Sequence, residues 1–269
     1  MKTYRRALTI AGSDSGGGAG IQADLKTFSA IGCFGMSVVT ALTAQNTVAV
    51  TAIHPVPPEF ITRQLDAVLT DIGVDAVKIG MLHSPDVIET VADALRRHAV
   101  TNIVLDPVMV AKSGDKLLQD DAVAALKSYL VPMADVITPN LPEAGVLLGR
   151  DVTTEKEMMT AGRELAQLGC RAVLLKGGHL EGAHSPDLLY IDGTTAPLRL
   201  EADRVDTPNA HGTGCTLSSA TAANLALGQS IEAAVREAKQ YVLQSLTAGA
   251  GYILGKGHGP VHHFHAFWD

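Results

Sequence analysis

Residues 209–228 read Asn209-Ala-His-Gly-Thr-Gly-Cys-Thr-Leu-Ser-Ser-Ala-Thr-Ala-Ala-Asn-Leu-Ala-Leu-Gly228. The pattern predicts a tight glycine turn that opens directly into a helix, because glycine lets the backbone bend and the small residues behind it let a helix pack closely. The first turn of such a helix carries N–H groups without intrahelical acceptors, at the positive end of the helix dipole. Gly212, Thr213 and Gly214 are therefore predicted to bind a phosphate or another anion.

Cys215 lies inside this predicted anion site. A thiol at a helix N-terminus has its thiolate form favoured, so Cys215 is a candidate proton acceptor or nucleophile. The alternative is a capped, alanine-rich packing helix that contains a buried cysteine. The rest of the chain has to decide between these two interpretations.

Strands and helices alternate along the rest of the chain. Short apolar runs typical of buried strands occur at 7–11, 38–44, 74–81, 102–105, 136–138 and 172–176. Helical patterns separate most of them, including one over 120–130. Two further short runs flank Asp192-Gly193, which indicates a hairpin. The alternation predicts an α/β fold with a mostly parallel central sheet between two helical layers. Because no linker or repeat divides the chain, we expect residues 1–269 to form a single domain.

The charge and cysteine content of the chain limit the classes of binding partner and the cellular location that we expect. The chain of 269 residues has a formal net charge of -7, which gives no reason to expect nucleic acid or an anionic membrane as partner. No run is long and apolar enough to span a bilayer. Cys33, Cys170 and Cys215 lack the spacing of a disulfide framework, so we expect a reducing, cytoplasmic location. Four histidines near the C-terminus are interpreted as part of a docked or solvated tail rather than a metal site.

Several polar residues stand where predicted strands end or the following helix begins. In a parallel sheet these carboxyl ends meet at one edge, where ligands bind. The residues are Gly12, Gln45, Asp106, Asn140, Glu143 and Lys176. We expect them to gather beside the turn at 212–215.

Three common motifs fail. After Gly16 and Gly18 a dinucleotide fingerprint requires a third glycine at the position of Ile21, and the expected acidic residue about 20 positions later is also missing. Gly255-Lys256 resembles the end of a P-loop, but Ala250 and Gly257 occupy two of its required positions. The nucleophile elbow Gly-x-Ser-x-Gly is absent from the sequence.

Phosphoryl transfer fits the remaining candidates. That reaction needs little covalent work from the protein, so a pre-formed anion site and nearby charges suffice. Mg²⁺ bound with a nucleotide needs only one or two carboxylates, which Asp106 and Glu143 supply in this interpretation.

Four ordered motifs resemble the ribokinase-like superfamily. They are the glycine-rich segment 11–24, Asp106-Pro-Val-Met109, Asn140-Leu-Pro-Glu143 and the Gly-Thr-Gly-Cys run at 212–215. Within the superfamily the chain is most similar to the hydroxymethylpyrimidine/phosphomethylpyrimidine kinases of thiamine biosynthesis. The resemblance covers nearly the whole chain. It implies two successive transfers from ATP, first to the hydroxymethyl oxygen of 4-amino-5-hydroxymethyl-2-methylpyrimidine and then to the monophosphate.

The resemblance also implies roles for individual residues. Gly212–Cys215 correspond to the anion hole, and Cys215 stands where most superfamily members carry an aspartate base. The implied substrate-binding residues are Gln45, Gly12, Asp24, Met81 and Val108. The implied ATP-binding residues are Asn140, Lys176, Lys239 and Lys112, with Asp106 and Glu143 placed to organise Mg²⁺. Family members also suggest a homodimer.

Two alternatives stay open. A pyridoxal or pyridoxine kinase uses the same scaffold, although Ala111 stands in the stretch where some pyridoxal kinases of this branch carry a second cysteine. A pyrimidine-binding sensor without catalysis is the other alternative. The loop 110–117, which contains Lys112, resembles the flap that closes over the substrate.

Overall fold

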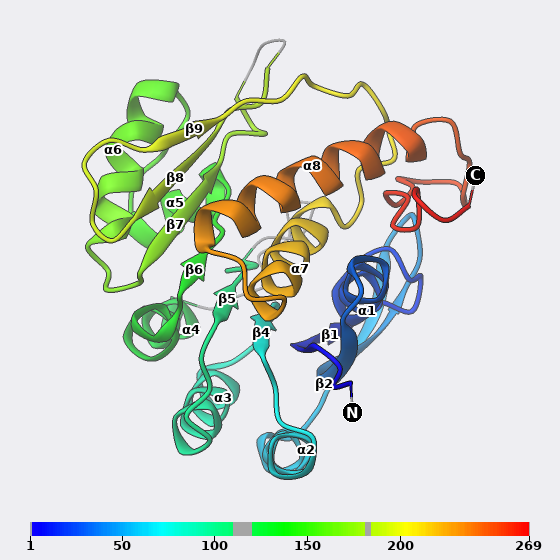
Figure 1. Ribbon diagram of the computed structural model, residues 1–269, viewed down its shortest axis with the longest axis vertical. Coiled ribbons are helices and arrows are strands. Elements are labelled where there is room, and N and C mark those ends of the chain that lie inside the picture. Colours follow the sequence, from blue (N-terminus) through cyan, green and yellow to red (C-terminus); the bar gives the residue numbers. More distant parts are fainter. Residues whose placement is uncertain (1, 110–119, 181–183, 269) are drawn as a thin grey trace.

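The computed structural model describes residues 2–109, 120–180 and 184–268. In these residues one nine-stranded sheet has the order β3-β2-β1-β4-β5-β6-β7-β8-β9 (Figure 1). The strands are β1 (Arg6–Ser13), β2 (Phe34–Gln45), β3 (Val50–Pro55), β4 (Ala76–Ile79), β5 (Ile103–Leu105), β6 (Val136–Ile137), β7 (Ala172–Lys176), β8 (Asp187–Ile191) and β9 (Leu198–Leu200). The six strands from β2 to β7 in this order are parallel, and β3, β8 and β9 pair antiparallel. The predicted mostly parallel sheet is confirmed.

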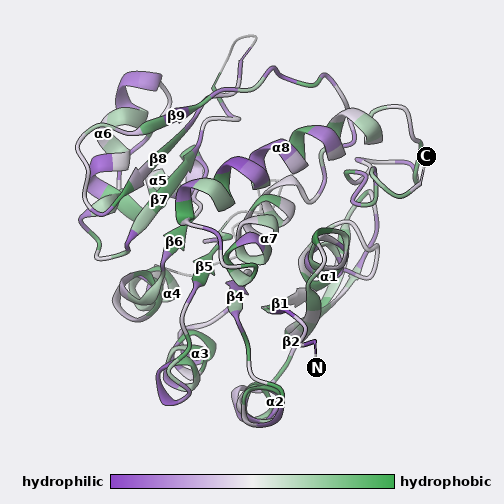
Figure 2. Ribbon diagram, viewed as in Figure 1, coloured by the Kyte–Doolittle hydropathy of each residue, from purple (hydrophilic) through white to green (hydrophobic). Residues whose placement is uncertain are grey.

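Helices cover both faces of the sheet (Figure 1). They are α1 (Gly20–Ile31), α2 (Pro58–Asp71), α3 (Pro85–Arg97), α4 (Asp120–Ala125), α5 (Leu141–Leu148), α6 (Glu155–Ala166), α7 (Thr213–Ala226) and α8 (Ile231–Gly249). Helices α1, α7 and α8 share one apolar cluster with the sheet, and α2 to α6 share the other. Hydrophilic and hydrophobic residues alternate along α6 and α8, as expected for helices with one buried side (Figure 2).

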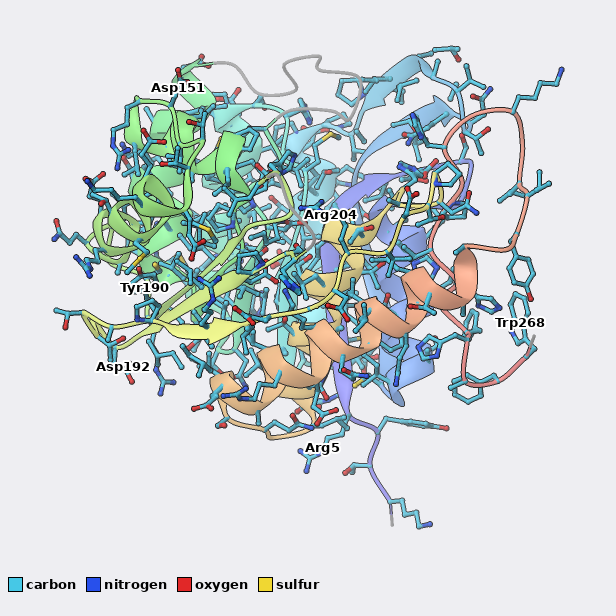
Figure 3. The ribbon with its side chains drawn as sticks, turned by 90° about the horizontal axis from the view of Figure 1, so that it is seen from above. Arg5, Asp151, Tyr190, Asp192, Arg204 and Trp268 are labelled. Atoms are coloured by element: carbon cyan, nitrogen blue, oxygen red, sulfur yellow. The ribbon has the colours of Figure 1, made fainter. Side chains whose placement is uncertain are left out.

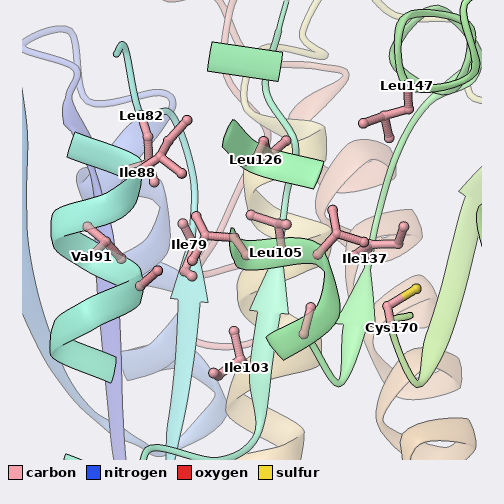
Figure 4. Packing of buried hydrophobic residues seen from close by; sticks show 14 of the residues in the cluster. Ile79, Leu82, Ile88, Val91, Ile103, Leu105, Leu126, Ile137, Leu147 and Cys170 are labelled. Carbon is pink, nitrogen blue, oxygen red and sulfur yellow. The ribbon is translucent and has the colours of Figure 1, made fainter. Parts of the chain in front are cut away.

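Aliphatic side chains from neighbouring strands fill the larger cluster. Ile79, Leu105 and Ile137 extend from β4, β5 and β6 toward the helices on that face, where Ile88 and Val91 of α3 lie beside Ile79 (Figure 4). All five side chains are fully buried. Because successive side chains of a strand point to opposite faces of the sheet, the residues between them, such as Val104 of β5, belong to the second cluster on the face under α7.

Local sequence signals mark the start of α3 and the turn between β8 and β9. The Ser84 hydroxyl accepts a hydrogen bond from the Val87 amide, and Pro85 follows as the first residue of α3. The hairpin between β8 and β9 turns at Asp192 and Gly193, which both have positive φ. Among the described residues, no helix is both long and apolar enough to cross a bilayer.

The structure differs from the sequence-based prediction at two places. Strand β3 was not expected, since all six of its residues are exposed and no alternating pattern marks it. It forms by antiparallel pairing with β2 at the edge of the sheet. The helix expected over 120–130 is interrupted, because α4 ends at Ala125 and residues Leu126–Leu130 continue as a π-helical turn.

The C-terminal segment packs against α7 and α8. Nε2 of His263 lies 3.1 Å from Oγ1 of Thr216, and the Tyr241 hydroxyl donates to the His263 carbonyl oxygen. His262 contacts the Trp268 ring at a centroid distance of 4.4 Å, and Trp268 lies beyond the end of α8 (Figure 3). The described residues contain no group of three or more metal-ligating side chains.

Burial of His263 makes stability depend on pH. Desolvation, with help from Lys26 and His262, lowers the pKa of His263 to about 3. Because the unfolded chain binds this proton with a pKa of about 6.5, the folded state loses stability as pH falls below that value. At pH 5 the loss is about 2 kcal/mol. Urea unfolding at pH 7 and pH 5 should show this loss in the wild type, but a smaller one in His263→Gln, which does not titrate. Equal losses would contradict the assignment.

Candidate active site

The predicted glycine turn forms the start of α7. Gly212 has φ of 81°, and a Cβ placed there would lie 1.9 Å from the Gly18 carbonyl oxygen. Only glycine fits both constraints, so the turn packs directly against the first glycine-rich loop. The Thr213 hydroxyl and amide both point to the Ala210 carbonyl oxygen. Residues 211–215 are half-buried, whereas α7 is buried from Thr216 to its end, so only the start of the helix reaches the surface.

Lys176 and Asp106 lie next to this turn. A Cβ on Gly214 would be 3.5 Å from Nζ of Lys176 and 3.9 Å from Oδ2 of Asp106. Asp106 follows β5 and Lys176 ends β7, so the parallel sheet brings them to one edge as predicted. Ser218, one turn into α7, donates to Oδ2 of Asp106 at 3.2 Å. The helix start, a cation and a carboxylate therefore share one site.

Two carboxylates surround Lys176. Its Nζ lies 3.2 Å from Oδ1 of Asp106 and 3.9 Å from Oε2 of Glu143. Burial would raise the pKa of Asp106, but Lys176 and Lys78 outweigh it and hold that pKa below its ordinary value. For Glu143 burial prevails over Lys176 and raises the pKa to about 7. Two acidic side chains face one lysine, so a bound cation would balance the remaining negative charge of the site.

Asn140 and Glu143 form a reciprocal cap at the start of α5. The Asn140 amide donates to Oε2 of Glu143 and the Glu143 amide donates to Oδ1 of Asn140, both at 2.8 Å. This capping box fixes the Glu143 carboxylate beside Lys176. A contact between Asn140 and ATP stays a prediction.

The expectation that the helix N-terminus favours the Cys215 thiolate is wrong for this chain. Burial raises the pKa of the thiol to about 11, and Asp24 and Asp106 add to the shift. Lys78 and the Gly20 amide oppose it without overcoming it. The residue as a whole is half-buried, but desolvation of the sulfur and the nearby negative charges of Asp24 and Asp106 together outweigh the helix end.

Lys78 and Asp24 form an ion pair with no exposed surface beneath Cys215. Nζ of Lys78 lies 2.9 Å from both carboxylate oxygens of Asp24, which also accept hydrogen bonds from Thr9 and Ser219. Ser219 is one turn after Cys215 on α7, which places the pair under the anion turn. Every part of the Asp24 side chain is buried, and a contact between Asp24 and the substrate stays a prediction.

The residues expected to bind the pyrimidine ring lie around the ends of β1, β2 and β4. Met81 packs on Gly12, where a Cβ would come within 2.9 Å of the methionine methyl group. The Gln45 amide nitrogen lies 3.4 Å from Nε2 of His211, the residue before the anion turn. Val108 is half-buried two residues after Asp106. Gln45 therefore lies beside the residue that precedes the turn, and its contact with a pyrimidine stays a prediction.

Two expected ATP-binding lysines have different outcomes. Lys239 on α8 donates to Oδ2 of Asp187 at 2.6 Å and to the Ser185 carbonyl oxygen. Asp187 also accepts from the Gly177 amide, so Lys239 is tied to the chain just after Lys176. Its contact with nucleotide stays a prediction. Lys112 and the whole expected flap, residues 110–117, lie outside the described residues.

Sequence reasoning missed Lys78 and His211 as members of the site. A signal for Lys78 was available, since a lysine inside the apolar run 76–79 requires a buried partner. His211 had only its place beside Gly212 to mark it.

Comparisons with known proteins agree with this geometry. A family model for phosphomethylpyrimidine kinase matches residues 14–262. The hydroxymethylpyrimidine/phosphomethylpyrimidine kinase of Salmonella typhimurium is 53% identical over 97% of this chain and 98% of that protein. The ADP complex of Bacillus subtilis pyridoxal kinase superposes with a TM-score of 0.91 at 38% identity, over 99% of this chain and 100% of that one.

A second solved structure is a phosphomethylpyrimidine kinase from Clostridium difficile. It superposes with a TM-score of 0.79 at 45% identity, over 90% of this chain and 99% of that chain. The full-length match in sequence and the shared fold lead to one assignment. This chain belongs to the phosphomethylpyrimidine kinase family.

Proposed function

We propose that this chain, as a single domain, transfers phosphoryl groups from ATP in two steps of thiamine biosynthesis. The first acceptor is the hydroxymethyl oxygen of 4-amino-5-hydroxymethyl-2-methylpyrimidine, and the second is the resulting monophosphate. The observation that carries the proposal is the start of α7 beside Lys176 and Asp106, in a chain that is 53% identical to a kinase with these two activities in its name.

Each part of the site has a role in the transfer. The amides of Gly214 and Cys215 are aimed at the migrating phosphoryl group, whose charge they stabilise together with Lys176. Asp106 holds Lys176 in place, and Thr138 and Ser218 hold Asp106. Cys215, in its thiolate form, accepts the alcohol proton in the first step. Because phosphoryl transfer passes through a loose transition state, positioning supplies most of the catalysis.

Asp106 and Glu143 fit Mg²⁺ bound with a nucleotide. Both side chains are buried, and both direct carboxylate oxygens toward Lys176. Because burial raises the pKa of Glu143, its ionised form is poorly stabilised, and an added cation would be favourable there. Mg²⁺ would neutralise phosphate charge there, and the carboxylates would hold it directly or through water.

Gln45 is proposed to pair with the edge of the pyrimidine ring. Gln45→Ala should weaken pyrimidine binding by about 30-fold, since the amide offers a donor and an acceptor side by side and each hydrogen bond contributes about 1 kcal/mol. ATP affinity should not change. Isothermal titration with each ligand measures both effects, and an equal loss for ATP would contradict the role.

Pyridoxal kinase activity is the second candidate function, which the superposition on the Bacillus subtilis pyridoxal kinase favours. ADP release measured with each alcohol and with the pyrimidine monophosphate separates the candidates. We expect turnover of both pyrimidines. Turnover of pyridoxal without the monophosphate would favour the second function, and binding without any turnover would favour a sensor.

We also propose a cytoplasmic homodimer. The edge strand β3 is exposed on both faces, with Val50 and Ile53 about half accessible, and unpaired edges favour pairing with another chain. Light scattering should give a dimer for the wild type and a monomer for Ile53→Asp. Met159→Asp, at an exposed apolar site on α6, is the matched control and should stay dimeric. A wild-type monomer would overturn this part.

A further inference from the structure

His211 connects the anion turn to two other parts of the site. Its Nε2 lies 3.1 Å from Oδ2 of Asp14 and 3.4 Å from the amide nitrogen of Gln45. Gly18 leaves room for the ring, because a Cβ there would come within 2.5 Å of Cδ2 of His211. The choice of which ring nitrogen of His211 carries a proton therefore affects Gln45, the side chain proposed to pair with the pyrimidine.

Asp14 decides which ring nitrogen of His211 carries a proton. The Asp14 carboxylate is almost fully buried and accepts hydrogen bonds from the amides of Gly16, Gly18 and Ala19 at 2.8–3.0 Å. Burial alone would raise the pKa of Asp14, but the hydrogen bonds from His211 and the backbone hold it below its ordinary value. An ionised carboxylate only accepts hydrogen bonds, so Nε2 of His211 must carry a proton.

Thr43 influences which end of the Gln45 amide, oxygen or nitrogen, points toward it. The Thr43 hydroxyl lies 2.8 Å from the Ser13 carbonyl oxygen and 3.3 Å from Oε1 of the Gln45 amide. Its single proton goes to the nearer acceptor, which leaves the hydroxyl oxygen as an acceptor toward Gln45. The two ends of an amide have the same shape, so the protons around it set its orientation.

We propose that His211, oriented by Asp14, is a positioning residue that fixes the Gln45 amide and thereby selects the 4-amino pyrimidine. In the favoured orientation, which exchanges the two ends of the Gln45 amide relative to the structure, the carbonyl oxygen shares the Nε2 proton of His211 with Asp14 and the NH₂ group donates to Thr43. The opposite orientation sets donor against donor at His211 and acceptor against acceptor at Thr43. The inference rests on the proposed function, because it concerns the ring that Gln45 pairs with.

A fixed amide distinguishes two pyrimidines of nearly equal shape. The 4-amino ring offers a donor at C4 and an acceptor at N3, whereas the 4-oxo analogue offers an acceptor at C4 and a donor at N3. A Gln45 amide that cannot turn matches only one of these orders. A free amide turns to match either, so losing His211 should cost selectivity rather than activity alone.

The test compares kcat/KM for 4-amino-5-hydroxymethyl-2-methylpyrimidine with that for its 4-oxo analogue. The wild type should prefer the amino compound. His211→Leu and Thr43→Val should each lower this preference by about fivefold, the value of one hydrogen bond of about 1 kcal/mol. His211→Gln should restore the preference, since its amide NH₂ can donate to both partners. Thr138→Val, on the phosphate side of the site, should slow both substrates equally and leave the ratio unchanged.

The outcomes separate the inference from the proposed function. A wild type that neither binds nor phosphorylates the amino compound overturns the proposed function. A wild type that prefers the amino compound, with the same ratio in Thr43→Val and in every folded His211 variant, overturns the role of His211. If His211→Leu does not fold, Thr43→Val and His211→Gln decide, and an absent preference in the wild type also overturns the inference.

Discussion

Cys215→Ala is expected to lower kcat for the first transfer by about 10²–10⁴-fold, the range of general base catalysis, while the protein still binds pyrimidine. The effect on the second transfer should be much smaller. A phosphate monoester has its second pKa near 6, so its acceptor oxygen is already ionised at neutral pH and needs no base. Separate assays of the alcohol and its monophosphate measure the two effects.

The rate of the first transfer is expected to rise with pH. Because burial raises the pKa of the Cys215 thiol to about 11, the thiol is protonated at neutral pH. The thiolate fraction then grows about tenfold for each pH unit between 7 and 9, and the wild-type rate should rise with it.

Two variants complete this test. Cys215→Ala should lose the rise with pH. Cys215→Asp should keep part of the activity with a flat profile, because an aspartate is ionised throughout this range. Full activity in the alanine variant, or an unchanged pH profile, would show that the thiol is not the base.

Lys78→Met is expected to lower the free energy of unfolding by about 3–5 kcal/mol. The substitution removes the cation and leaves the Asp24 carboxylate buried with only the Thr9 and Ser219 hydroxyls as partners. An unpaired buried charge is far more costly than the pair is stabilising, so the loss reflects Asp24 as much as Lys78. Urea unfolding monitored by circular dichroism measures it.

Two controls isolate the buried charge. Lys156→Met makes the same change at an exposed position on α6 and should alter stability by less than about 0.5 kcal/mol. Adding Asp24→Asn to Lys78→Met removes the stranded charge and should recover part of the loss. A loss below about 1 kcal/mol in the single variant would contradict the buried pair.

The sequence was sufficient for the elements that bury a face. Strands such as β4 and β7 are continuous apolar runs, and α3 begins at a serine cap followed by proline, so burial and capping marked them directly. Strand β3 left no such signal, because both of its faces are exposed and only its pairing with β2 defines it.

The site was predictable where topology alone brings residues together. Asp106 and Lys176 follow parallel strands, so their meeting at one edge needed no side-chain detail. The Cys215 pKa and the burial of Asp24 depend on what packs between helix and sheet, which no local pattern records. Lys78 shows the same limit, since its partner is 54 residues away in sequence.

The most direct test of the account is a crystal structure of the enzyme with ADP, Mg²⁺, aluminium fluoride and the hydroxymethylpyrimidine. Aluminium fluoride imitates the phosphoryl group in transfer, and it should lie at hydrogen-bond distance, about 3 Å, from the amides of Gly214 and Cys215. The hydroxymethyl oxygen should face the Cys215 sulfur, with the ring edge on Gln45. A fluoride bound away from residues 212–215, or an alcohol remote from the sulfur, would contradict the account.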